Sequence, residues 1–306
     1  MKHELLYKRV ENKDISEILQ LFQIVFKRTL DKEYYINKYK KDEQFDSFIA
    51  YNNKKKIIAH VAYSINYLKY NKNKYKVALR FTSMVHNKFQ KKGIYKKLLF
   101  YSFEKLKKQN IKIILCWPNN INLIGTNNHE TFRYLYQIPI YSKIIKGKRK
   151  LIIDQIKQIK KYVKSNYKYF LNKRKNEDFA LYKNRNYFIN RYFNIKKINY
   201  YFYYFNNNYI IFTYKNNYEI YLTDFIINNI SFDDCLKNFF NFFNNNRVVI
   251  KVWINSNNIL YKKLMKYHFK KTKKTFNFGY YNLTNQKYPN NYLINLNYSM
   301  GDIDVF

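Results

Sequence analysis

Apolar residues recur along the first part of this chain at the spacings of strands and helices. Leu5 to Val10 is a short extended run, which predicts a first strand. The next apolar residues repeat every three or four positions and predict one buried helix face: Ile15, Ile18, Leu19, Phe22, Val25 and Phe26. Asp14 with Glu17 predicts a capping pair at the start of that helix. A second helix, rich in tyrosine, is predicted from Asp31 to about Lys41.

Strands separated by Asn- and Lys-containing turns come next. Ser47–Tyr51 and Ile57–Tyr70 are extended runs, and Tyr75 leads into a third run that ends with Leu79–Val85. Two successive antiparallel hairpins are therefore predicted. A helix follows, with an apolar face made by Leu98, Leu99, Ser102, Phe103 and Leu106. Ile111–Leu115 then predicts a short apolar strand.

The junction between Val85 and the helix carries the clearest chemical signal. Gly93 is the first of only five glycines in the chain, and it stands between a strand and a helix. The first N–H groups of a helix have no partner within the helix, and the helix dipole makes that end positive. A tight turn at Gly93 can aim the amides of residues 91–95 at one point, and Lys91 and Lys92 add positive charge. A pyrophosphate fits such a site.

The run Gln90-Lys91-Lys92-Gly93-Ile94-Tyr95 resembles the acyl-CoA loop of GNAT-type N-acetyltransferases. That family has Arg or Gln, two residues, Gly, one residue, then Gly or Ala, so Tyr95 departs from the pattern. Met84-Val85-His86 before the loop and Trp117-Pro118-Asn119 after the next strand resemble a branch found among bacterial surface-sugar acetyltransferases. The resemblance implies an α/β (α+β) GNAT fold, with a mixed, mostly antiparallel sheet flanked by helices. It also implies acetyl-CoA as the cofactor.

The same resemblance supplies the candidate site residues. Those expected to bind the cofactor are Met84, Val85, Gln90, Lys91, Lys92, Gly93, Ile94, Tyr95 and Asn119. His86 is the titratable group nearest the loop and is either a catalytic base or a structural residue. Thr131–Tyr136 is expected to be helical, and Tyr134 or Tyr136 is the candidate acid, although Pro139-Ile140 replaces the family's Gly-Phe pair. His60, on an alternating strand, is expected to be packed, and no metal site is expected.

The second half of the chain repeats the first in part. Arg247–Asn255 ends a strand with Trp253-Ile254-Asn255, as Ile111–Asn119 ends with Trp117-Pro118-Asn119. No glycine lies between Gly147 and Gly279, so no second phosphate loop is evident. We therefore expect an acyl-CoA-binding GNAT domain over residues 1–146, a basic helical linker over 147–175 and a degenerate GNAT-like domain over 176–306. The tail Leu296–Phe306 resembles the ending of long, two-lobed members of the branch.

The formal net charge is +38, which has two explanations. Such charge suits a nucleic acid or an anionic membrane. Lys, Asn, Tyr, Ile and Phe also have AT-rich codons, and the basic residues are spread along the chain, which favours the composition of a low-GC genome. Residues 143–175 hold thirteen Lys or Arg and one acid, Asp154. That segment is expected to be a solvated helix, the alternative being weak contact with an anionic membrane.

The two cysteines, Cys116 and Cys235, predict no disulfide framework. The start of the chain lacks an apolar signal region and no stretch approaches a membrane span, so we expect a cytoplasmic protein. The leading hypothesis is an acetyl-CoA-dependent N-acetyltransferase acting on an amine, an amino sugar for cell-surface polysaccharide. One alternative is a Fem-type aminoacyl-tRNA-dependent transferase. The other is a basic protein that binds nucleic acid or membrane without catalysis.

Overall fold

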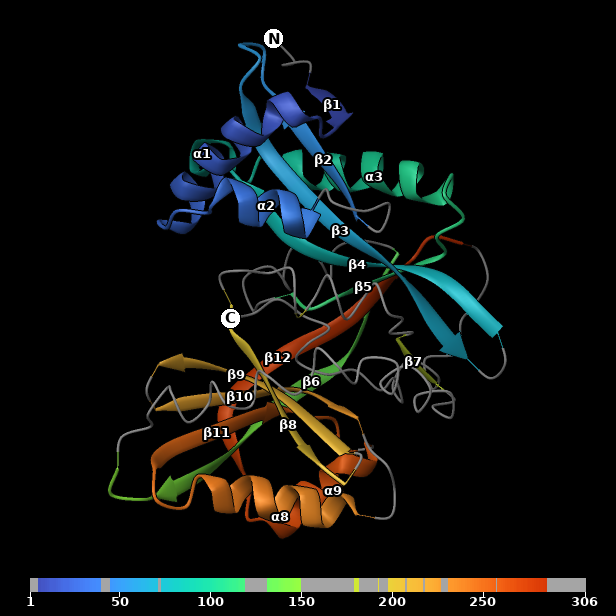
Figure 1. The fold of residues 1–306 in the computed structure, drawn as a ribbon. Coiled ribbons are helices and arrows are strands. Elements are labelled where there is room, and N and C mark those ends of the chain that lie inside the picture. The colour runs from blue at the N-terminus through green and yellow to red at the C-terminus, as the bar shows by residue number, and fades with distance from the viewer. Residues whose placement is uncertain are drawn as a thin grey trace. The chain divides into compact units, whose positions relative to one another are not determined.

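The computed structural model describes residues 5–39, 45–70, 73–118, 131–149, 179–181, 192, 198–206, 208–216, 218–226, 231–256 and 258–284. The chain divides into two compact units (Figure 1). Unit 1 takes residues 1–68, 73–136 and 277–290, and unit 2 takes residues 69–72, 137–276 and 291–306. None of the described helices is long and apolar enough to cross a membrane.

Unit 1 contains the predicted strand–helix–helix opening, the two hairpins and the strand–helix–strand. Its elements are β1 (Leu6–Arg9), α1 (Ile15–Phe26), α2 (Lys32–Tyr39), β2 (Phe45–Tyr51), β3 (Ile57–Tyr70), β4 (Asn73–Val85), α3 (Ile94–Lys107) and β5 (Ile113–Cys116). Neighbouring strands lie in the order β1-β2-β3-β4-β5. β1, β2 and β3 pair antiparallel, and β4 pairs parallel with β5 because α3 connects them.

The core of unit 1 lies on both faces of this sheet. Alternate residues of β2 show this: Phe48 is in the apolar cluster of α3, and Ile49 is in that of α1. The α3 side chains in contact with the sheet are Leu98, Leu99, Phe103 and Leu106, as their spacing predicts. Helices α1 and α2 cover one face and α3 the other (Figure 1).

Unit 2 has the same strand–helix–strand arrangement. Its elements are β8 (Tyr200–Phe205), β9 (Asn208–Asn216), β10 (Glu219–Ile226), α8 (Phe232–Phe242), β11 (Arg247–Trp253) and α9 (Ile259–Lys266), with the short β7 at Phe179–Leu181. β8, β9 and β10 form an antiparallel meander, and β10 pairs parallel with β11. The crossover α8 packs Leu236 and Phe239 onto the sheet, as α3 packs its apolar face in unit 1.

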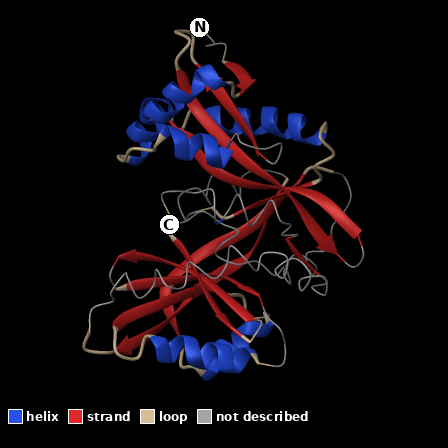
Figure 2. Cartoon of the chain, in the orientation of Figure 1, coloured by secondary structure: helices blue, strands red, loops and turns tan. Residues whose placement is uncertain are grey.

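Two long strands, β6 (Phe132–Lys146) and β12 (Lys270–Asn282), contribute to both units (Figure 2). The end of β12 belongs to unit 1, where Gly279 pairs with Cys116 of β5. The later part of β6 belongs to unit 2, where Ile140 pairs with Trp253 of β11. Each unit is therefore completed by a strand from the other half of the sequence. The predicted domains 1–146 and 176–306 are continuous stretches of sequence and therefore differ from this division. In the structure, residues 277–290 return to unit 1 and residues 137–146 belong to unit 2.

Two local predictions were wrong. Residues 132–136 begin strand β6 and are not helical, which agrees with the preference of Phe and Tyr for strands. Asp14 and Glu17 do not form a capping pair. The carboxylate of Asp14 accepts a hydrogen bond from the N–H of Glu11 at 2.8 Å, and Glu17 accepts one from the N–H of Ile57 at 2.8 Å. Most of the predicted linker, residues 150–175, lies outside the described residues, as does the tail Leu296–Phe306.

Candidate active site

The candidate site lies beside the last residues of β4. Its parallel register with β5 runs from Val77↔Ile113 to Leu79↔Leu115, and β4 then continues to Val85. The pairing thus ends at Leu79, one residue before the end of β5 at Cys116. The edge of β4 from residue 80 onward can hydrogen-bond an extended ligand, as a neighbouring strand would. Met84 on this segment is buried toward α1, and Val85 packs toward α3.

The loop after β4 is fixed at both of its ends. The N–H of His86 donates to the carbonyl oxygen of Ile58 on β3 at 2.8 Å. The side-chain amide of Gln90 donates to the carbonyl oxygen of Val85 at 3.1 Å and to Oδ1 of Asn87 at 3.2 Å. Gln90 was predicted to bind the cofactor directly, whereas here it closes the loop on itself. It can still shape the site through the turn that follows it.

That turn contains two left-handed residues. Lys91 has φ 62° and Gly93 has φ 74° with ψ 0°, and Gly93 is the N-cap of α3. Such alternation of backbone conformation turns successive N–H groups toward one side and makes a concave anion site. A Cβ atom built on Gly93 would have no heavy atom within 4 Å, so the space above it is open. Lys91 and Lys92 are exposed beside it. The turn therefore fits a diphosphate.

His86 caps the short 3₁₀ helix Asn87–Phe89. Its Nδ1 accepts a hydrogen bond from the N–H of Lys88 at 3.2 Å, and its ring packs edge-on against Phe89. Because Nδ1 accepts this bond, a neutral ring carries its proton on Nε2. His86 would have to break the cap before Nδ1 accepted a proton. The geometry thus supports the structural alternative, while the catalytic alternative stays a prediction.

A buried histidine supports the irregular part of β4. His60 is fully buried, with Nε2 3.1 Å from the hydroxyl of Tyr35 and Nδ1 3.1 Å from the carbonyl oxygen of Thr82. A carbonyl only accepts, so Nδ1 carries the proton and Nε2 accepts from Tyr35. Burial lowers the pKa of His60 to about 4. Thr82 has φ 30°, which is strained for a β-branched residue, and such strain often accompanies functional sites.

The exit of β5 is held by the end of β12. The ring of Trp117 lies 5.2 Å from that of Phe278, and the side-chain amide of Asn277 donates to the carbonyl oxygen of Pro118 at 3.0 Å. Asn119, the next residue and a predicted ligand, lies outside the described residues. This support comes from residues more than 150 positions further along the chain, so local patterns could not have revealed it.

The two candidate acids lie on strand β6. Tyr136 packs edge-on against Phe278, and Tyr134 is exposed. Partial burial nevertheless raises the pKa of Tyr134, so its phenol stays protonated at neutral pH. A protonated phenol suits a general acid. The resemblance placed this tyrosine on a helix, however, whereas both tyrosines lie on a strand here.

Arg80 is a buried residue that the sequence reasoning missed. It follows Leu79, where the pairing with β5 ends, and its Nη1 donates to the hydroxyl of Tyr281 at 2.6 Å. The available signal was a charged residue inside the apolar run Leu79–Val85. Strand propensity alone gives that residue no role.

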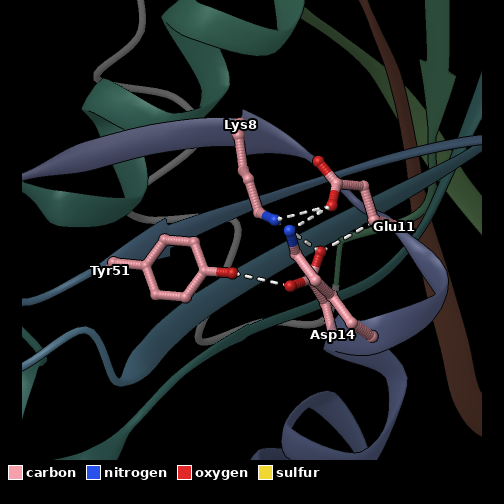
Figure 3. Close-up of polar contacts among 5 residues, drawn as sticks. Lys8, Glu11, Asp14 and Tyr51 are labelled. Atoms are coloured by element: carbon pink, nitrogen blue, oxygen red, sulfur yellow. Dashed lines mark hydrogen bonds and ion pairs between the residues drawn. The ribbon is translucent and has the colours of Figure 1, made fainter.

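One further polar cluster ties β1 to β2 (Figure 3). The buried carboxylate of Asp14 is 2.9 Å from the ammonium of Lys8 and accepts from the hydroxyl of Tyr51 at 2.7 Å. Its members bond one another, which marks the cluster as structural. Among the described residues, no group of three or more His, Cys, Asp or Glu side chains is placed to hold a metal ion.

Comparison with known proteins agrees with this geometry. Residues 6–131 match the family model described as an acetyltransferase (GNAT) domain. A probable N-acyltransferase from Enterococcus faecalis is similar in structure, with a TM-score of 0.65, 11% identity, and coverage of 92% of this chain and 73% of that one. A GCN5-related N-acetyltransferase from Anabaena variabilis has a TM-score of 0.66, 11% identity and the same coverage, 92% and 73%.

A third similar structure is the N-myristoyltransferase of Saccharomyces cerevisiae with bound myristoyl-CoA. Its TM-score is 0.57 at 12% identity, with coverage of 90% of this chain and 82% of that one. A search of curated protein sequences finds no match. The predicted GNAT fold is confirmed, and residues 6–131 are the part of the chain that matches the acetyltransferase (GNAT) domain model.

Proposed function

We propose that this GNAT-fold enzyme transfers an acyl group from acyl-CoA to an amine, with acetyl-CoA as the donor and an amino sugar of a cell-surface polysaccharide as the acceptor. The observation that carries the acyl-CoA part is the turn at Lys91 and Gly93, which joins the end of β4, beyond its pairing with β5, to the N-terminus of α3. The diphosphate of CoA fits this turn, and the pantetheine arm fits the edge of β4. The donor and acceptor named here rest on the sequence resemblance.

In the reaction, the amine nitrogen attacks the thioester carbonyl carbon and the carbon–sulfur bond breaks. The amine loses a proton to a base, and the departing thiolate takes one from an acid. The edge of β4 would hold the donor so that its carbonyl faces the acceptor, and this positioning accounts for much of the catalysis. His86 remains the candidate base, and Tyr134 or Tyr136 the candidate acid.

The loop recognises the part that every acyl-CoA shares. It supports binding of the class, and the identity of the acyl group is a separate question. Weak contact of residues 143–175 with an anionic membrane and a cytoplasmic location are likewise proposals from the sequence.

The experiment that tests this function uses the purified full chain. A thermal-shift series with CoA and acetyl-CoA is expected to raise the melting temperature, because a ligand that binds only the folded state stabilises it. A mass-spectrometric screen of amino-sugar nucleotides with acetyl-CoA then identifies the acceptor by its added acyl mass. Absence of any CoA-induced shift would refute the proposal. Salt-sensitive tRNA binding without CoA binding would favour the tRNA-dependent alternative.

A further inference from the structure

Arg80 is a positive charge inside the apolar core of unit 1. Only 8% of the residue is exposed, and its neighbours in the strand are Leu79 and Phe81. The guanidinium carbon lies 5.2 Å from the ring centre of Tyr281 and 6.0 Å from that of Tyr95. Aromatic rings and one phenol hydroxyl thus surround a group that never loses its charge in proteins.

The described part of the chain provides no counter-ion for this charge. Its ion pairs include none to Arg80, and the only hydrogen bond of the guanidinium there goes to Tyr281. Guanidinium has five N–H donors in a planar fork that matches a carboxylate. A buried cation is costly unless an anion pairs with it. Among the described residues, the charge of Arg80 is therefore not neutralised by an acidic side chain, and an anionic ligand could pair with it.

The position of Arg80 along β4 indicates which part of the donor would carry that anion. Arg80 is the first residue after the pairing of β4 with β5 ends, and the diphosphate turn begins beyond His86 at the other end of the same segment. Six residues of strand span about 20 Å. An extended pantetheine arm lying along this segment places the thioester near its start. The group nearest to Arg80 is then the acyl group and not the diphosphate.

Exposure supports the same assignment. The turn at Lys91, Lys92 and Gly93 is exposed, as a site for the charged, hydrated end of CoA should be. Arg80 is buried beneath α3 beside Tyr95 and Tyr281. In the proposed acyl-CoA site a ligand must enter deeply to reach Arg80, and the acyl end, which is farthest from the diphosphate, would be the part that does so.

We propose that the acyl group transferred by this enzyme ends in a carboxylate, as in succinyl-CoA, and that Arg80 binds that carboxylate with Tyr281 orienting the guanidinium. The inference rests on the proposed acyl-CoA site, and it replaces acetyl-CoA, the donor that rests on the sequence resemblance alone, with a short dicarboxylic acyl-CoA. The bond changes are those of any acyl transfer: the carbon–nitrogen bond forms, the carbon–sulfur bond breaks, and the terminal carboxylate is carried over unaltered into the product.

The test compares succinyl-CoA with butyryl-CoA, which has the same chain length and a methyl group in place of the carboxylate. The dissociation constants of both, and of CoA, are measured by calorimetry with the wild-type chain. Succinyl-CoA is expected to bind at least about tenfold more tightly than butyryl-CoA, the scale of one charge-assisted contact. Equal affinities would overturn the inference while leaving the acyl-CoA site intact. If CoA itself failed to bind, the proposed function would fall instead.

Variants locate the effect. Arg80→Met keeps an unbranched, though shorter, side chain without the charge, and is expected to abolish the preference while leaving the affinity for CoA itself unchanged. Arg80→Lys should keep part of the preference, and Tyr281→Phe should weaken it. A loss of CoA affinity in a folded Arg80→Met would assign the guanidinium to the diphosphate and overturn the inference. If Arg80→Met does not fold, the affinities of the wild-type chain and of Arg80→Lys for succinyl-CoA and butyryl-CoA still test the inference.

Discussion

The side-chain amide of Gln90 donates to the carbonyl oxygen of Val85 across 3.1 Å, and this bond joins the last residue of β4 to the start of the glycine turn. The chain between them includes the 3₁₀ helix Asn87–Phe89, so the bond closes a small loop. One exposed side chain therefore sets where the turn at Lys91 and Gly93 lies relative to the strand edge. Donor binding should depend on it more than folding does.

Gln90→Glu tests that relationship. The substituted side chain has no amide donor and would place a carboxylate against two acceptors, the carbonyl oxygen of Val85 and Oδ1 of Asn87. We expect CoA affinity to fall by about tenfold or more, with the free energy of unfolding changed by less than about 0.5 kcal/mol because the residue is exposed. Calorimetric titration and urea unfolding measure the two. Gln90→Ala, which loses the bond without adding charge, should show a smaller loss of affinity.

Gly93 allows a matched pair of substitutions that differ in charge. Asn and Asp both tolerate the left-handed conformation that Gly93 adopts at φ 74°, and the space beyond its Cα is open. Gly93→Asn and Gly93→Asp should therefore have similar melting temperatures. CoA should bind the Asp variant at least about tenfold more weakly, because its carboxylate repels the diphosphate. Equal affinities of the two variants would mean that no anion binds at this turn.

The local pattern predicted much of unit 1, and the failures have physical reasons. The spacing of Leu98, Phe103 and Leu106 identified α3, and β3 has the predicted bounds Ile57–Tyr70. The same reasoning assigned a helix to Thr131–Tyr136, because it followed the family pattern over the strand propensity of the aromatic residues.

The contacts that complete the candidate site join distant parts of the chain. Arg80 and Tyr281 are 201 positions apart, and Pro118 and Asn277 are 159 apart. No periodicity within a window of the sequence contains such information. A charged residue in a predicted apolar strand is the one local sign that β4 has a special role.

The burial of His60 predicts a specific loss of stability in mild acid. Its pKa is lowered to about 4 by burial, against about 6.5 in the unfolded chain. Between these values the unfolded state binds the proton and the folded state does not, so stability falls as pH falls from 6.5 to 4. The full effect is about 3 kcal/mol.

Chemical denaturation at pH 7 and pH 4.5 measures this change. His60→Asn retains a donor for the carbonyl oxygen of Thr82 and does not titrate, so its stability should depend less on pH in this window. Tyr35→Phe removes the donor to Nε2 and should cost about 1 to 2 kcal/mol at pH 7. A wild-type protein with equal stability at both pH values would contradict the buried, neutral histidine.

The buried carboxylate of Asp14 predicts a second loss of folding stability, at lower pH than that of His60. Burial acts to raise its pKa, but hydrogen bonds from Glu11, Tyr51 and Lys8 outweigh it and hold the pKa below its usual value. The folded state thus favours the carboxylate, and its contribution is present above the unfolded pKa of about 3.9 and lost as pH falls through the folded pKa.

Asp14→Asn should destabilise the protein by about 1.5 to 3 kcal/mol at pH 7. The amide can still accept from Tyr51, but its NH₂ group would then face the ammonium of Lys8 and the N–H of Glu11. Urea unfolding of this variant, of Lys8→Met and of the double variant forms a cycle. If the two single effects simply added, the ion pair would not be the source of the stability.

A substitution at Gly279 tests how closely strand β12 must pack against β6 in unit 1. A Cβ atom built on it would lie 2.5 Å from Cζ of Phe132 and 2.7 Å from the carbonyl oxygen of Arg133. β6 therefore approaches β12 more closely at this point than any side chain permits. Gly279→Ala should destabilise the protein by about 1 to 3 kcal/mol, as overpacking does.

The two obstacles at Gly279 can be separated by a second substitution. Phe132→Leu shortens the ring that a new methyl group meets, but leaves the Arg133 carbonyl in place. The double variant Gly279→Ala, Phe132→Leu should recover only part of the loss caused by Gly279→Ala, because the backbone contact remains. Melting curves of the four proteins give this interaction energy. Full recovery would mean that the ring alone requires glycine. No loss in Gly279→Ala would mean that β6 and β12 are further apart than described, and the support that β12 gives to Trp117 and Arg80 would need another source.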